Sequence, residues 1–265
     1  SFSALGSALG IPMRASIGYS DHDGTLKGDN FQRTTASINL TPSLFDDHLK
    51  IEFNARGMYT ENTFANRDAI GSATSFDPTQ WMYDTSSMFN SYYTWTGSNG
   101  YQLNLATTNP VALLNLVDDT AEVRRIIGNA KFDYKLHFFP DVTATVNVGL
   151  DKSNSHGRTI TSEFIPTSDT TWNGSRNTYT QKATNQLFDA YLTYKKSINE
   201  SHNLNVVAGY SYQKFEVDNY IFDSEKQEDG NDFEFIDKYE NVLLWYFGRL
   251  NYAFQCKYLF HSFPL

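Results

Sequence analysis

Residues 129–151 read NAKFDYKLHFFPDVTATVNVGLD, and this stretch decides the fold. From Asn129 to Phe138 every second residue is apolar, and the same alternation resumes at Val142 after Pro140-Asp141. Because successive side chains of a β-strand point to opposite faces, a period of two predicts two antiparallel strands joined by a short turn. One face of the hairpin would be apolar, and the other would carry charged and hydroxylated side chains.

The same alternation recurs along the chain, and helical periodicity is nearly absent. It covers residues 33–40, 49–59, 188–195, 204–213 and 244–252. We count eight strands and the start of a ninth. The apolar faces often end in an aromatic residue, namely Tyr59, Phe138, Tyr194, Tyr212 and Phe254. In a membrane barrel such residues would form the aromatic girdles at the level of the lipid headgroups.

The connections between these strands alternate in length. The short ones are Thr41 to His48, Pro140-Asp141, Ser197 to His202, and Gln255-Cys256. The long ones are residues 62–122, 154–182 and 218–239. Short turns on one side and long loops on the other are typical of outer-membrane barrels, in which the short turns face the periplasm.

Residues 62–122 are too many for a plain loop in a compact domain. We expect them to form one long extracellular loop. Within it, Asn109 is a suitable helix N-cap and Pro110 suits the first helical position, so a short helix should begin there. This helix would lie over the barrel mouth or in its upper lumen.

The sequence therefore predicts an all-β fold, an antiparallel transmembrane β-barrel segment of about eight to nine strands. As these 265 residues alone, it should form an open curved sheet. The alternative is a soluble β-sandwich, which would make the chain a soluble or surface-exposed β-rich carbohydrate-binding module. A sandwich need not alternate its loop lengths, and its core faces seldom end in aromatic residues.

The composition excludes several function classes. The net charge is -9 and no Lys/Arg cluster stands out, so nucleic acid is not an expected partner. The longest apolar run, Val242 to Phe247, is far too short for a membrane-spanning helix. The six histidines lack paired metal-ligand spacing, and neither a nucleophile elbow nor a phosphate loop occurs. We therefore expect no enzyme activity, no catalytic residue, no metal site and no cofactor.

Several strings resemble the SusC/RagA-type TonB-dependent outer-membrane nutrient importers. The stretches Met13–Asp21, Phe31–Pro42 and Asp47–Lys50 are similar to the early barrel of that family. The strings Asp77-Pro78-Thr79-Gln80 and Asn109–Leu113 look like its first large outer loop. Two further strings look like later strands of that family, namely Gly128-Asn129 with Asp133-Tyr134, and Phe247–Tyr252. The resemblance covers nearly the whole chain, to about Tyr258-Leu259.

This resemblance implies that residues 1–265 are part of one barrel domain of the 22-stranded type. It further implies a multi-pass protein of the bacterial outer membrane that contacts lipid and imports glycans or peptides. The implied partners are a SusD-like surface lipoprotein, an oligosaccharide or peptide substrate, and the TonB complex acting through a plug region. The plug, the TonB-contacting segment and the C-terminal strands of the family are not recognisable here, and the pattern is lost after Lys257-Tyr258-Leu259. An internal barrel fragment is therefore expected.

The aromatic residues of the long loops are the candidate substrate-binding residues. They are Trp81, Tyr83, Tyr92, Tyr93, Trp95 and Tyr101 in the first long loop, and Trp172 and Tyr179 in the second. Flat rings offer large apolar faces at low entropic cost, which suits stacking on sugars or holding peptide side chains. The competing interpretation is that they pack the loops themselves or meet the lipoprotein.

Two groups of charged residues have a structural interpretation. We expect Lys50, Glu52, Arg56, Lys131, Asp133 and Lys135 to point into the lumen, as a network of inward charges beside a plug. The acidic run from Asp218 to Glu240 lacks the spacing of an EF-hand. A solvated outer loop accounts for it better than a Ca²⁺ site.

Overall fold

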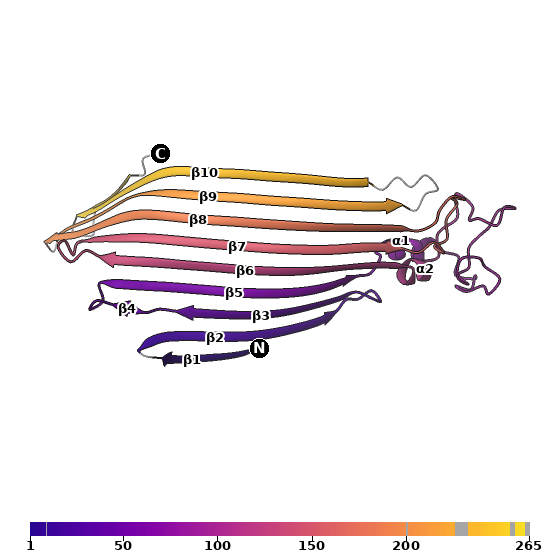
Figure 1. Ribbon diagram of the computed structural model, residues 1–265, viewed down its shortest axis with the longest axis horizontal. Coiled ribbons are helices and arrows are strands. Elements are labelled where there is room, and N and C mark those ends of the chain that lie inside the picture. The colour runs from indigo at the N-terminus through magenta and orange to yellow at the C-terminus, as the bar shows by residue number, and fades with distance from the viewer. Residues whose placement is uncertain (9, 200, 226–232, 255–257, 263–265) are drawn as a thin grey trace.

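The computed structural model describes residues 1–8, 10–199, 201–225, 233–254 and 258–262, and they form one antiparallel sheet with a loop unit at one end (Figure 1). The elements in chain order are β1 (Phe2–Ala8), β2 (Ile11–Asp23), β3 (Asn30–Leu40), β4 (Ser43–Leu44), β5 (Leu49–Phe64), α1 (Asp68–Ser75), α2 (Pro110–Asn115), β6 (Val117–Lys135), β7 (Val142–Thr161), β8 (Ser175–Asn199), β9 (His202–Glu225), β10 (Phe233–Phe254) and β11 (Tyr258–Ser262).

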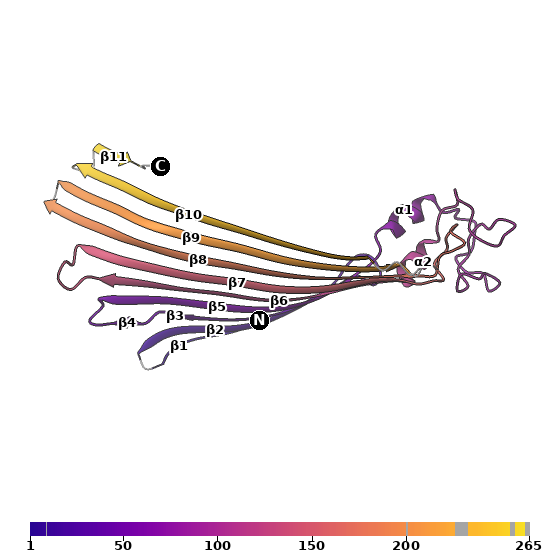
Figure 2. The same cartoon turned by 45° about the horizontal axis from the view of Figure 1, so that its top comes forward.

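Apart from the short β4, which lies between β3 and β5 in sequence and pairs with β5, neighbouring strands of the sheet follow one another in sequence, and every pairing is antiparallel. Within the described residues, β1 pairs only with β2 and β11 only with β10, so the sheet does not close. Figure 2 shows that it is curved. The predicted fold, an open curved sheet of antiparallel strands, is confirmed.

Two strands were not counted from the sequence. β1 (Phe2–Ala8) consists mainly of small residues and shows no clear alternation, and β4 is a two-residue strand inside the predicted turn from Thr41 to His48. Their sequences carry little signal because pairing with β2 and β5, rather than side-chain pattern, holds them in the sheet.

The pairing register separates the side chains into two faces. Val146 on β7 lies opposite Phe132 on β6 and opposite Ala190 on β8. Directly opposed residues of neighbouring strands project to the same face of the sheet. This outer face carries large exposed apolar side chains on most strands, namely Ile17, Phe53, Phe132, Val146, Val148, Leu150, Phe188, Leu192, Leu244 and Tyr246. We call this band the apolar belt.

The apolar belt has the height of a bilayer core. On β7 it runs from Val142 to Leu150, and Lys152 is the next residue on the same face. Nine residues span about 30 Å along a strand, which a barrel tilt reduces to about 25 Å. Tyr59 and Tyr212 lie at its loop-end border and Tyr194 at its opposite border, as predicted for girdles. Phe138, in contrast, lies in a turn and is 85% exposed.

The strands continue well past the apolar belt, which corrects the predicted loop ends. β7 extends to Thr161 and β8 begins at Ser175, so the connection is 162–174 rather than 154–182. β9 and β10 likewise occupy residues 218–225 and 233–239 of the predicted third loop. Beyond the belt both faces of a strand meet water, and the hydrophobic alternation that reveals a strand is lost.

The opposite face, which we call the lumenal face, is held together by polar side chains. Asn129 donates to Asn147 (2.7 Å), Asn147 donates to Asp189 (3.0 Å), and Ser211 donates to the same carboxylate (2.5 Å). This chain crosses four strands, β6 to β9. The predicted inward residues Lys50, Glu52, Arg56, Lys131, Asp133 and Lys135 all lie on this face. Lys131 pairs with Asp133 (2.8 Å), as expected for a network of wall charges.

Short turns and long connections lie at opposite ends of the sheet (Figure 1). The turns at Thr41–His48 and Pro140-Asp141 are at one end, which we call the turn end. Residues 65–116 and 162–174 are at the other, the loop end. The predicted Gln255-Cys256 turn lies outside the described residues, as does the middle of the acidic run, residues 226–232.

We predict that Val146→Arg destabilises the inserted barrel by about 2–4 kcal/mol, since a guanidinium would face the middle of the hydrocarbon. Asn147→Arg should be much milder, because the neighbouring lumenal carboxylate of Asp189 can pair with it. Folding into lipid vesicles, followed by urea titration, measures both. Equal tolerance at the two positions would contradict the assignment of the faces.

Candidate functional site

Residues 65–116 form a folded unit at the loop end, which we call the loop unit (Figure 2). The two short helices α1 and α2 contact each other, and α2 contacts β6. A small apolar core lies among them, made of Ala69, Phe76, Phe89, Ala112 and Leu113, all at most 8% exposed. The loop unit is therefore packed on itself and positions its own side chains.

Asn109 is the central residue of the loop unit. It is completely buried, and its side-chain oxygen accepts from the backbone N–H groups of Val111 (2.9 Å) and Ala112 (3.2 Å) at the start of α2. Its amide nitrogen donates to the carbonyls of Met82 (2.7 Å) and Tyr93 (3.1 Å). The predicted N-cap is confirmed, and the same side chain also ties two distant segments of the loop to the helix.

The predicted aromatic residues of the loop unit divide into exposed and packed rings. Trp81 is 85% exposed and Tyr83 is 59% exposed. Tyr92 is 7% exposed, lies 5.5 Å from the Tyr83 ring, and its hydroxyl accepts from Asn115 (3.0 Å).

Three further rings form a cluster beside α1. The ring of Phe76 lies 5.0 Å from Trp95 and 6.4 Å from Tyr93, and the Tyr93 and Trp95 rings meet edge to face at 5.3 Å. Tyr93 and Trp95 are partly exposed, so they combine a packing role with an accessible edge. Tyr101 meets Phe89 edge to face at 6.5 Å. The structure thus brings together Tyr83 with Tyr92 and Tyr93 with Trp95.

The second connection, residues 162–174, is hydrogen-bonded to the loop unit. The N–H of Gln102 donates to the carbonyl of Thr167 (3.1 Å), and the N–H of Ser162 donates to the carbonyl of Leu116 (2.9 Å). Trp172 lies within this connection, where its indole N–H donates to the carbonyl of Ser162 (3.2 Å). Its indole therefore fastens the second connection.

Tyr179 lies on β8 instead of in a loop. It covers Gly157 of β7, where an added Cβ would approach the tyrosine ring to 2.3 Å. This close contact gives Tyr179 a structural role, because an aromatic ring over a strand glycine shields the exposed backbone.

Three solvent-accessible aspartates stabilise tight turns in these connections. Asp77 accepts from the backbone N–H and the hydroxyl of Thr79, and Asp169 accepts in the same way from Thr171. Asp84 accepts from the hydroxyl and the N–H of Ser86. These hydrogen bonds favour the ionised form, so the pKa of each of the three carboxyls is lowered.

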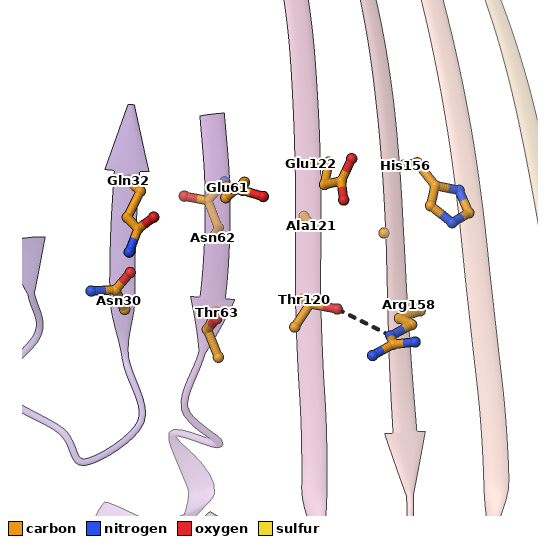
Figure 3. Close-up of a pocket in the computed structure, with 11 residues that line it drawn as sticks. Asn30, Gln32, Glu61, Asn62, Thr63, Thr120, Ala121, Glu122, His156 and Arg158 are labelled. Carbon is orange, nitrogen blue, oxygen red and sulfur yellow. Dashed lines mark hydrogen bonds between the residues drawn. The ribbon is translucent and has the colours of Figure 1, made fainter. Parts of the chain in front are cut away.

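Sequence reasoning missed a polar hollow of about 530 Å³ at the loop-end half of the sheet (Figure 3). It spans β3, β5, β6 and β7, on the outer face above the apolar belt, and Arg158 donates to the hydroxyl of Thr120 there (3.3 Å). Glu61, Glu122 and His156 occupy neighbouring positions across these strands. Among the described residues, however, no group of three or more His, Cys, Asp and Glu side chains is placed to hold a metal ion.

The amino-acid sequence of the chain is similar to those of two known receptors. The chain is 34% identical to the TonB-dependent receptor SusC of Bacteroides thetaiotaomicron, over 94% of this chain and 27% of that protein. The chain is homologous to SusC. It is also 24% identical to the TonB-dependent receptor P26 of Formosa agariphila, over 97% of this chain and 26% of that protein. The chain thus spans about a quarter of the length of these curated relatives. No protein-family model matches it.

Solved structures agree on the fold of this SusC-like chain. The RagAB peptide transporter superposes with a TM-score of 0.71 at 21% sequence identity, over 96% of this chain and 30% of that one. The same transporter in its open-open state gives the same score. The described sheet therefore has the fold of a section of a TonB-dependent barrel. The relatives are receptors and transporters, which confirms the prediction that the chain is not an enzyme. Among the described residues, neither helix has the length and apolarity to cross a membrane.

We predict that Asn109→Ala loosens the loop unit, with a loss of at least about 2 kcal/mol of local stability, because a helix cap is lost and two buried carbonyls lose their donor. Limited proteolysis of the folded barrel should then cut within residues 65–116 at lower protease concentration. Asn104→Ala is the matched control, since Asn104 is exposed in the same unit. Identical cleavage of the two variants would show that Asn109 does not hold the unit together.

Proposed function

We propose that these residues form part of the wall and mouth of a multi-pass importer in the bacterial outer membrane. The observation that carries this proposal is the division of the sheet into an apolar belt of bilayer height and a lumenal face joined by polar hydrogen bonds. Homology to SusC supports the same function. The alternative, a soluble β-rich binding module, would need a second layer to cover the belt, and all described strands belong to one sheet.

The substrate and the partners follow as further parts of this proposal. We infer uptake of oligosaccharides or peptides, powered by the TonB complex through a plug region and assisted by a SusD-like lipoprotein at the cell surface. The names of the relatives support this view, because SusC is a TonB-dependent receptor and RagAB is a peptide transporter. The exposed rings of Trp81 and Tyr83 are the parts of the loop unit best placed to touch a sugar or a peptide.

The orientation of the sheet can be tested with epitope tags in the intact membrane protein. A tag inserted at Leu105, which is 99% exposed in the loop unit, should bind antibody on whole cells. A tag inserted at Asp46, in the turn between β3 and β5, should bind antibody only after the outer membrane is permeabilised. Surface labelling at Asp46 would overturn the proposed topology.

The role of the exposed rings can be separated from loop packing. We expect Trp81→Ala to reduce substrate uptake by about three- to tenfold through the loss of one stacking contact, with normal barrel assembly and protease resistance. Trp95→Ala removes a ring of the cluster with Phe76 and Tyr93, so it should raise protease sensitivity of the loop unit as well. Unchanged uptake by Trp81→Ala would assign that ring to partner contact or to no contact at all.

A further inference from the structure

The polar part of the outer face extends farther above the apolar belt than a phospholipid headgroup reaches. On β6 the belt ends at Ile126, which is 63% exposed, and Arg124, Glu122 and Thr120 follow on the same face. The strand from Ile126 to Thr120 spans about 20 Å, which the tilt of a barrel reduces to about 15 Å. The headgroup layer of a phospholipid leaflet is only about 5–7 Å thick. A lipid that covers this surface therefore needs a taller headgroup.

The polar hollow of about 530 Å³ lies within this surface (Figure 3). Its volume is in the range of small-molecule binding sites. Two rows of outer-face side chains line it, namely Gln32, Glu61, Glu122 and His156, and above them Asn30, Thr63, Thr120 and Arg158. Amides, carboxylates and hydroxyls are the groups that hydrogen-bond sugar hydroxyls, since an amide can donate to one hydroxyl and accept from its neighbour. Among the described residues, the side chain of Gln32 has no hydrogen-bond partner and is free for such a ligand.

Lys152 lies directly above the apolar belt on β7. It is the first outer-face residue beyond Leu150, and the residues directly opposite it, Ile126 and Thr184, are uncharged. Within the part of the chain that the structure describes, Lys152 has no ion-pair partner. Its ammonium group is therefore available to an anion at the level of the lipid headgroups.

Arg124 of β6 lies one row closer to the hollow. Its side chain is 72% exposed, and its guanidinium lies 3.7 Å from the carboxylate of Glu122 and 5.6 Å from the ring centroid of Tyr59. A distance of 3.7 Å is long for a charge-assisted hydrogen bond, so the guanidinium keeps donors for a second anion. Arg124 and Lys152 thus place two positive charges between the belt and the hollow.

We propose that this surface binds a phosphorylated glycolipid of the outer leaflet. Its acyl chains lie on the apolar belt, its phosphate lies between Arg124 and Lys152, and its sugars occupy the polar hollow. Arginine and lysine bind phosphate through charge-assisted hydrogen bonds. Glu61 and Glu122 favour uncharged sugar hydroxyls in the hollow, because they would repel a second phosphate there. The inference rests on the proposed function, since it requires the belt to lie in the outer membrane with the loop end outside.

Lipid binding can be measured on the intact membrane protein in phospholipid nanodiscs. The probe is fluorescent rough lipopolysaccharide, which carries both phosphate and a short saccharide. The comparison probes are the same lipid without its phosphates, and phosphatidylglycerol, which has a phosphate but no sugar. We expect the first probe to bind about tenfold more tightly than either of the others, because it alone uses both the cations and the hollow. Equal affinity for phosphatidylglycerol, or for the lipid without phosphate, would overturn the proposal.

Two pairs of charge-neutralising substitutions locate the phosphate. Arg124→Gln combined with Lys152→Gln should weaken lipopolysaccharide binding by about tenfold, because two phosphate contacts are lost. The matched control is Lys182→Gln combined with Lys238→Gln, since both of these outer-face lysines lie directly opposite Asp218. The control should bind as the parent protein does. Equal weakening by the two pairs would overturn the assigned position of the phosphate.

A substitution in the hollow tests the sugar contacts separately. Gln32→Ala should weaken lipopolysaccharide binding by about threefold through the loss of one hydrogen-bonding amide, and it should leave phosphatidylglycerol binding unchanged. Gln186→Ala, on the outer face of β8 and outside the hollow, is the matched control. Heat-modifiable migration verifies that each variant is folded. Unchanged binding by Gln32→Ala would overturn the placement of the sugars.

The same samples distinguish this inference from the proposed function. A parent protein that inserts into nanodiscs but does not prefer lipopolysaccharide overturns the glycolipid site and leaves the proposed function in place. A parent protein that does not insert into a lipid bilayer overturns the proposed function itself.

Discussion

A peptide group surrounded by hydrocarbon must find its hydrogen-bond partner on a neighbouring strand, and the rest of this structure depends on that constraint. An unpaired backbone group in the bilayer core costs several kcal/mol, so a spanning sheet requires continuous ladders. The ladders here are long and almost free of irregularities. β6 and β7 pair without a shift from Val117 to Lys135, and the one shift between β8 and β9 lies at Ser197 and Asn199, beside the turn.

Once the ladders satisfy the backbone, the side chains of each face are free to suit a different solvent. The outer face carries the apolar belt, and the lumenal face joins β6 to β9 through Asn129, Asn147, Asp189 and Ser211. The polar chain adds lateral cohesion without placing any charge in lipid. Toward the loop end the outer face of β5 to β7 becomes polar, with Glu61, Glu122 and His156 in one row, and the wall continues as a support for the loop unit. That support keeps Trp81 and Tyr83 well away from the bilayer.

The sequence predicts the strands where one face is in lipid and fails where both faces are in water. Alternation marks residues 188–195, whereas β8 runs from Ser175 to Asn199. The site was predictable only as a group of aromatic residues. Whether a ring is exposed, as in Trp81, or packed, as in Tyr92, depends on contacts distant in sequence. Asn109 shows why. Its role as a helix N-cap can be predicted from the local sequence, but its hydrogen bonds to the carbonyls of Met82 and Tyr93 span 27 and 16 residues.

Residues Val242 to Phe247 of β10 lie within the apolar belt, and there the alternation of apolar and polar residues is lost for a different reason. On β7 above the apolar belt, in residues 152–159, alternation is lost because polar residues occupy both faces, and water explains both. In β10 it is lost because apolar residues occupy both faces, and lipid explains only one. A barrel wall has no need for Leu243 and Trp245 in a water-filled lumen, and a polar residue there would preserve the ladder equally well. Gly209 strengthens the point, since it admits two rings in a row where a larger residue would separate them. The same alternation that identifies the lipid-facing side therefore also locates, by its local failure, a part of the lumenal face whose side chains are apolar.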